Sequence, residues 1–164
     1  MLETLEKPAL LEPLALNKLN VSEIQKFIPH RYPFLLIDRV TEHEPGKYIE
    51  GYKNISINEQ LFQGHFPGNP LYPGVLQLES IAQLGAVLVG AMPEGQGKIG
   101  VFLGIDNARF RKMVVPGDRM DIKVELLKLK RSIGKFTGEI TVNEELVCEA
   151  EMMFAITERG AREK

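Results

Sequence analysis

Residues 75–90 read VLQLESIAQLGAVLVG, and apolar side chains in this stretch occur on nearly every face of a helix. Such a pattern is typical of a helix that is buried on all sides, because a surface helix keeps one polar face. No apolar run of the chain reaches the roughly 18 residues that a membrane span needs. We therefore predict a helix over residues 75–90 that the other elements of the protein must cover.

The segments on both sides of this helix have the pattern of strands. Residues 34–40 and 48–55 predict two strands joined by a turn at Pro45-Gly46. Because short connections make neighbouring strands antiparallel, we predict an α+β fold in which a curved antiparallel sheet wraps around the long helix. Four more strands are predicted at residues 98–106, 120–127, 136–142 and 146–157. The last three form a meander, in which Gly134 and Asn143 separate one strand from the next.

The start of the domain carries a helix signal. Ser22 and Gln25 have the spacing of a capping box ahead of a short helix that Pro29 ends. A single sheet of this kind leaves free edges, so a dimer that joins two sheets is a natural hypothesis. The chain is predicted to divide into an N-terminal extension, one folded domain and a C-terminal tail, at residues 1–19, 20–158 and 159–164.

Charge and cysteine content exclude several classes of protein. The chain has 164 residues, with 20 Lys+Arg against 22 Asp+Glu, so no overall basic field attracts nucleic acid or an anionic membrane. The single Cys148 cannot form an internal disulfide, and no Cys/His spacing fits a zinc site. The first residues lack the basic and apolar segments of a secretion signal. These features favour a one-domain cytoplasmic protein that holds no metal.

A loop rich in glycine and proline precedes the predicted helix. Six of the eleven residues from Gly64 to Gly74 are glycine or proline, and the loop contains His65. Histidine suits proton abstraction near neutral pH, because its ordinary pKa is about 6.5. Gly74 adjoins the helix start, where unpaired backbone N–H groups and the helix dipole can polarise a carbonyl oxygen.

Glu79 is the only carboxylate in the predicted helix, with Gln83 one turn later on the same face. We expect a carboxylate in apolar surroundings to be paired, hydrogen-bonded or held protonated, and a protonated acid can donate its proton. A turn histidine and a helical glutamate are each compatible with an ordinary structural role. Together with Gly74, however, His65 and Glu79 favour removal of a proton next to a carbonyl and loss of a β-hydroxyl.

At these residues the chain resembles a known family. The blocks GHFPGNP at 64–70, PGVL at 73–76 and Glu79 with AQ at 82–83 resemble the signature of (3R)-hydroxyacyl-[acyl-carrier-protein] dehydratases of the FabZ type. The resemblance spans residues 20–158 and implies a hot-dog fold, dimers that assemble as trimers of dimers, and an active site at the dimer interface. Further matching blocks lie at 30–38, 53–54, 106–111 and 115–118.

The resemblance also implies the roles of single residues in type II fatty acid biosynthesis. His65 of one subunit would take the α-proton of a β-hydroxyacyl thioester, and Glu79 of the other would protonate the departing hydroxyl, directly or through a water. The backbone N–H of Gly74 would bind the thioester oxygen, and Val75 beside it would also bind substrate. The products would be a trans-2-enoyl thioester and water, with no metal or redox cofactor.

The acyl chain and its carrier need surfaces of their own. The acyl chain is expected to lie in an apolar tunnel. Relatives often carry tyrosine at the position of Val101, where it gates this tunnel, so that gate is missing here or supplied by another residue. The implied partner is the acidic acyl carrier protein, which presents the substrate on a phosphopantetheine arm and would dock on Arg109, Arg111 and Lys112. The predicted apolar wall of the tunnel consists of Phe66, Leu76, Phe102 and Ile105.

Three alternatives use the same fold. A related dehydratase that also isomerises the new double bond carries Asp where this chain has Glu79. A hot-dog acyl-CoA thioesterase would use a nucleophilic Asp or Glu without this His/Glu motif. A non-catalytic domain that senses acyl thioesters would lose the histidine or gain a DNA-binding segment, and the chain shows neither change.

Overall fold

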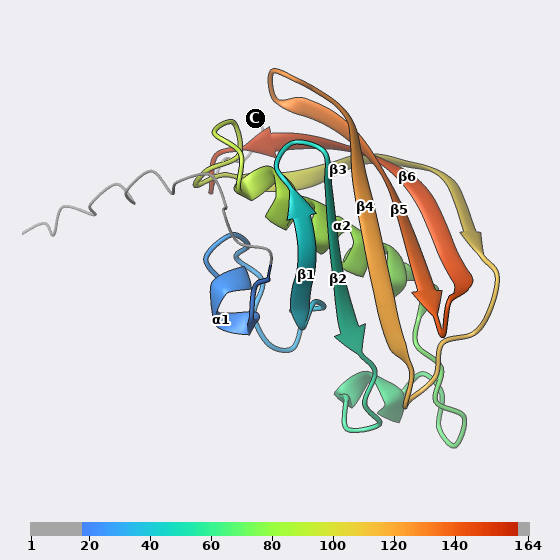
Figure 1. The fold of residues 1–164 in the computed structure, drawn as a ribbon. Helices are drawn as coiled ribbons and strands as arrows, with labels where there is room; N and C mark the ends of the chain where they lie inside the picture. The colour runs from blue at the N-terminus through green and yellow to red at the C-terminus, as the bar shows by residue number, and fades with distance from the viewer. Residues whose placement is uncertain (1–17, 161–164) are drawn as a thin grey trace, which may run out of the picture.

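A computed structural model describes residues 18–160 (Figure 1). Residues 1–17 of the predicted N-terminal extension therefore lie outside the described part of the chain. One antiparallel sheet with the order β1-β2-β4-β5-β6-β3 curves around the long helix α2 (Gly74–Gly90), which confirms the predicted α+β architecture. The strands are β1 (Arg39–Glu44), β2 (Tyr48–Asn54), β3 (Ile99–Phe110), β4 (Arg119–Lys130), β5 (Ile133–Val142) and β6 (Glu145–Thr157).

The long helix lies directly on the sheet and is buried on most of its surface. Ile81 and Leu84 are fully buried, and a Cβ added at Gly138 of β5 would come within 2.1 Å of the Ile81 side chain. The prediction of burial on every side is wrong along one stripe, where small side chains leave space between the helix and its neighbours. This partly open stripe follows the helical spacing Val75, Glu79, Ala82, Ala86 and Gly90.

Two of the predicted elements before α2 are shifted. Helix α1 (Val21–Ile24) is capped by Asn20 and Glu23, and not by Ser22 and Gln25, because the Asn20 side chain accepts the Glu23 N–H while the Glu23 carboxylate accepts the Asn20 N–H. The first strand begins at Arg39 and not at residue 34. Residues 34–37 are apolar because the segment packs on the core, where Leu36 and Ile37 are buried.

The strands after α2 also differ in part from the prediction. The meander β4-β5-β6 is confirmed, but Gly134 lies inside β5, where a Cβ would come within 2.3 Å of the Phe154 ring. β3 and β4 do not form a hairpin, because residues 111–118 connect them and β3 pairs with β6. The outer edge of β3 therefore has no partner strand within the described part of the chain.

Two further properties of residues 18–160 bear on function. No helix among them is long and apolar enough to cross a membrane. Over the same range, no three His, Cys, Asp or Glu side chains gather closely enough to hold a metal ion.

Candidate active site

The loop before α2 is held in shape by its own backbone. It follows the 3-10 helix η1 (Gln60–Gln63), and Phe66 and Asn69 exchange backbone hydrogen bonds of 3.0 and 2.9 Å across Pro67 and Gly68. Gly68 has a φ of +74°, which glycine adopts without strain, and proline fixes the preceding position of such a turn. The turn therefore holds His65 at a fixed place beside the helix start.

His65 is oriented by one hydrogen bond. Its Nδ1 lies 2.6 Å from the carbonyl oxygen of Leu71, and since a carbonyl only accepts, Nδ1 carries the proton. The other ring nitrogen, Nε2, then holds a free lone pair in the neutral imidazole. The half-buried ring stacks on Phe66, with 4.0 Å between the ring centroids. A ring nitrogen with a free lone pair is able to accept a proton.

Gly74 begins α2 and packs against a strand from the far edge of the sheet. A Cβ at Gly74 would come within 2.9 Å of the Phe110 ring, so the close approach of β3 requires glycine here. The N–H groups of Gly74 and Val75 belong to the first turn of the helix and have no acceptor within it. They can therefore donate to an oxygen on which negative charge develops.

Glu79 is held by hydrogen bonds, which confirms one of the three states expected for it. Its side chain is 19% exposed, and Gln83 donates from Nε2 to Glu79 Oε1 over 2.9 Å. The same Gln83 amide donates to the Phe34 carbonyl and accepts from the Leu36 N–H, both at 2.8 Å. Gln83 therefore fixes the carboxylate relative to the segment that follows α1.

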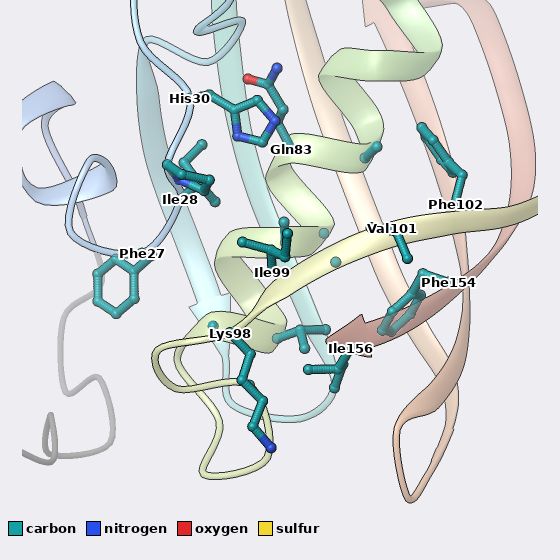
Figure 2. A pocket seen from close by; sticks show the side chains of 18 of the residues that line it. Phe27, Ile28, His30, Gln83, Lys98, Ile99, Val101, Phe102, Phe154 and Ile156 are labelled. Carbon is teal, nitrogen blue, oxygen red and sulfur yellow. The ribbon is translucent and has the colours of Figure 1, made fainter. Parts of the chain in front are cut away.

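A cavity of about 350 Å³ runs from Glu79 along the open stripe of α2. Figure 2 shows His30 and Gln83 at one end of this cavity and Lys98 at the other, with β3 and β6 side chains along its wall. Apolar groups predominate in the wall, which includes Ala82, Ala86, Val101, Phe102, Phe154 and Ile156.

The structure divides the predicted site residues into two groups. Glu79 and Phe102 line the cavity, whereas His65 and Gly74 do not. Among the described residues, no hydrogen bond or ion pair joins His65 to Glu79 within one chain. The predicted wall residues Phe66, Leu76 and Ile105 also lie outside this cavity, together with Val75.

The predicted docking residues differ in their pairing. Arg111 forms an ion pair with Glu149, and Lys112 forms one with Glu145. Arg109 donates only to the neighbouring Ala108 carbonyl, at 2.9 Å, within the described residues. Arg109 is therefore the least neutralised of the three cations.

His30 is a site residue that the sequence analysis did not assign. Its Nε2 lies 3.5 Å from Glu79 Oε1, and its ring lines the same cavity. The residue lies within a block that matches the family, but no pattern along the chain connects position 30 with position 79. Only the packing of this segment on α2 brings the two side chains together.

Comparisons with known proteins agree with this arrangement. The model of the FabA-like domain matches residues 28–151. A relative from Desulforamulus reducens, named 3-hydroxyacyl-[acyl-carrier-protein] dehydratase FabZ, is 54% identical over 141 residues, which cover 86% of this chain and 99% of the relative. A relative of the same name from Roseiflexus castenholzii is 55% identical over 138 residues, covering 84% and 96%.

Solved structures share the fold at low sequence identity. The dehydratase heterocomplex ApeI:P from Xenorhabdus doucetiae superposes with a TM-score of 0.69 at 19% identity, covering 83% of this chain and 91% of that one. A hypothetical thioesterase with coenzyme A from Streptococcus pneumoniae gives a TM-score of 0.56 at 19% identity, covering 74% and 87%. These likenesses confirm the predicted hot-dog fold.

Proposed function

The chain belongs to the FabZ family of 3-hydroxyacyl-[acyl-carrier-protein] dehydratases, and on this premise we propose that its His65 and Glu79 are the base and acid of the reaction. The enzyme is a hydro-lyase that converts (3R)-3-hydroxyacyl-acyl carrier protein to trans-2-enoyl-acyl carrier protein and water. The observation that carries the role of the base is the bond from His65 Nδ1 to the Leu71 carbonyl, which leaves Nε2 free to accept a proton.

The reaction combines one proton removal with one proton donation. His65 Nε2 takes the α-proton, and the N–H groups of Gly74 and Val75 stabilise the negative charge that develops on the thioester oxygen. Glu79 gives its proton to the β-hydroxyl, directly or through a water, the C–O bond breaks and water leaves. The step is redox-neutral, so the two side chains and the helix N-terminus suffice for the chemistry.

The two catalytic side chains come from two subunits in this proposal. Within one chain the Glu79 cavity does not include His65. The outer edge of β3, which has no partner strand among residues 18–160, exposes apolar side chains, among them Leu103 at 49%. In this proposal, joining β3 of two copies covers this edge, and His65 of one chain faces Glu79 of its partner, as the family resemblance implies. A trimer of such dimers is the larger assembly that the family resemblance implies.

The cavity along α2 holds the acyl chain in this proposal, because its wall is mostly apolar and its volume suits a small ligand. Phe102 lines it within one chain. Phe66 and Ile105 are exposed by 47% and 42%, and Leu76 is half-buried, so these side chains are free to contact the acyl chain once the second copy is in place. Val101 lies in the wall at the position where relatives often carry a gating tyrosine, so that gate is missing here or supplied by another residue.

Acyl carrier protein is the proposed partner of the enzyme, and its phosphopantetheine arm delivers the thioester. Arg109 is the main cation of the proposed docking surface, with Arg111 and Lys112 partly neutralised by their glutamates. A cytoplasmic location, which the single cysteine favours, stays a prediction. Burial raises the pKa of the Cys148 thiol to about 12, so this thiol offers no nucleophile for an alternative thioester hydrolysis.

Turnover of a 3-hydroxyacyl-acyl carrier protein by single variants tests the proposal. We expect His65→Ala and Glu79→Gln each to lose about 100-fold or more of the activity while the oligomer stays folded. A trans-2-enoyl product without cis isomer separates the enzyme from an isomerising dehydratase, and the absence of free thiol separates it from a thioesterase. Substantial dehydration by either variant would reject the assigned roles.

A further inference from the structure

We propose that His30 is a positioning residue for Glu79. The His30 ring donates its Nε2–H to the Glu79 carboxylate while Glu79 gives up the catalytic proton. The inference rests on the proposed role of Glu79 as the acid. It assigns to His30 a neutral hydrogen bond, and no proton transfer of its own.

Two donors converge on one oxygen of the carboxylate. Gln83 Nε2 donates to Glu79 Oε1 over 2.9 Å, and His30 Nε2 lies 3.5 Å from the same Oε1. Among residues 18–160, no hydrogen bond or ion pair involves the second oxygen, Oε2. A protonated carboxyl group accepts at its carbonyl oxygen and carries its proton on the other. The geometry therefore places the catalytic proton on Oε2.

The protonation of His30 follows from its other ring nitrogen. Nδ1 is buried, and no hydrogen-bond partner for it lies in the described range of the chain. An imidazolium would place a charged N–H at this partnerless position, where the loss of hydration is expensive. The neutral ring with its hydrogen on Nε2 leaves only a lone pair there. His30 therefore acts as a neutral donor that faces Glu79 Oε1.

The distance of 3.5 Å is longer than an ordinary N–H···O bond. Catalytic hydrogen bonds are often long without substrate and shorten in the reacting complex. When Glu79 loses its proton, both oxygens become negatively charged and attract the Nε2–H more strongly. The hydrogen bond from His30 thus becomes stronger as the reaction proceeds. A bond that strengthens in this way increases kcat more than it increases the affinity for substrate.

The segment that carries His30 is held together by its own hydrogen bonds and is joined to α2 through Gln83. Arg31 donates to the carbonyls of Gln25, Ile28 and His30, at 3.0, 2.9 and 2.7 Å. The His30 ring also stacks on Phe34, with 6.4 Å between the centroids, and Gln83 holds the Phe34 carbonyl. The donor is therefore placed before substrate binds, as a positioning role requires.

The test compares substitutions at His30 in the full-length oligomer. We expect His30→Leu to lower kcat about tenfold while KM stays within about twofold, which corresponds to the loss of one hydrogen bond to a charged group. His30→Gln, whose amide reaches as far as Nε2, should restore most of kcat. His30→Asn is equally polar but shorter, so we expect it to lower kcat about tenfold as well. The comparison of His30→Gln with His30→Asn therefore tests the inference even if the leucine variant does not fold.

His43 provides the matched control, because its ring is also half-buried but has no ion pair with a carboxylate among the described residues. His43→Leu should keep the kcat of the parent enzyme. Equal kcat values for His30→Gln and His30→Asn, or an unchanged kcat in His30→Leu, would overturn the inference. An active Glu79→Gln variant in the same series would instead reject the proposed role of Glu79.

Discussion

The two edges of the sheet are built differently. At one edge the short strand β1 is covered, since Val40 exchanges two backbone hydrogen bonds of 3.0 Å with Leu19, which is buried. At the other edge β3 is twelve residues long, and its outer side has no partner within residues 18–160. Most β3 side chains are exposed, including the apolar Leu103 and Ile105.

This difference connects assembly with catalysis. A long apolar edge strand in water is a site for pairing with another chain, whereas the covered β1 edge is not. The same β3 strand supplies Val101 and Phe102 to the cavity wall and places Phe110 against Gly74. The edge that we propose to bind a second copy therefore borders both parts of the proposed active site.

A charge on the β3 edge should have the largest effect. Leu103→Glu would bury a carboxylate in the proposed interface, and we expect the dimer to dissociate and the activity to fall about 100-fold or more. Light scattering and the dehydration assay measure the two outcomes. Ile57→Glu is the control, because Ile57 is 64% exposed and lies just after β2, a strand that does not neighbour β3 in the sheet. A monomeric Leu103→Glu variant with full activity would contradict the account.

Filling the cavity beside β3 should have the next largest effect. Ala86→Leu adds three carbons to the open stripe of α2, and we expect turnover of long 3-hydroxyacyl chains to fall about tenfold while that of the four-carbon substrate stays close to normal. Steady-state rates across chain lengths test this outcome. An equal loss at all lengths would indicate that the acyl chain lies elsewhere.

Charge reversal near the end of β3 should have a smaller effect. We expect Arg109→Glu to raise KM for acyl carrier protein substrates several-fold and to leave turnover of a pantetheine thioester unchanged, because only the former carries the acidic protein. Arg111→Glu should act more weakly, since Glu149 already neutralises Arg111. Arg39→Glu on β1 is the matched control, and an equal effect there would argue against docking at β3.

The smallest effect is the pH dependence of the Tm that His43 in β1 contributes. Burial lowers the pKa of His43 below its ordinary value of 6.5, so the unfolded chain takes up a proton before the folded one as the pH falls. We expect the Tm to decrease by a few degrees at most as the pH falls through 6.5, and His43→Gln to weaken this dependence. A Tm that rises over the same range would contradict the assigned environment.

The sequence predicted most of the architecture because its strongest signals are local. Period-two strands and an apolar run with one carboxylate are visible without the fold, and so is the turn that holds His65. The position of β3 could not be predicted, because the loop at 111–118 does not show which strand β3 pairs with. The same limit hid His30, whose contact with Glu79 depends on how a distant segment packs on α2.

The central claim is that His65 of one chain works with Glu79 of another. The most direct test mixes the inactive variants His65→Ala and Glu79→Gln under conditions of subunit exchange. Half of the resulting dimers should be mixed, and each of these has one intact site, so we predict about a quarter of the parent activity. No recovery after confirmed exchange would show that His65 and Glu79 do not share a site across the interface.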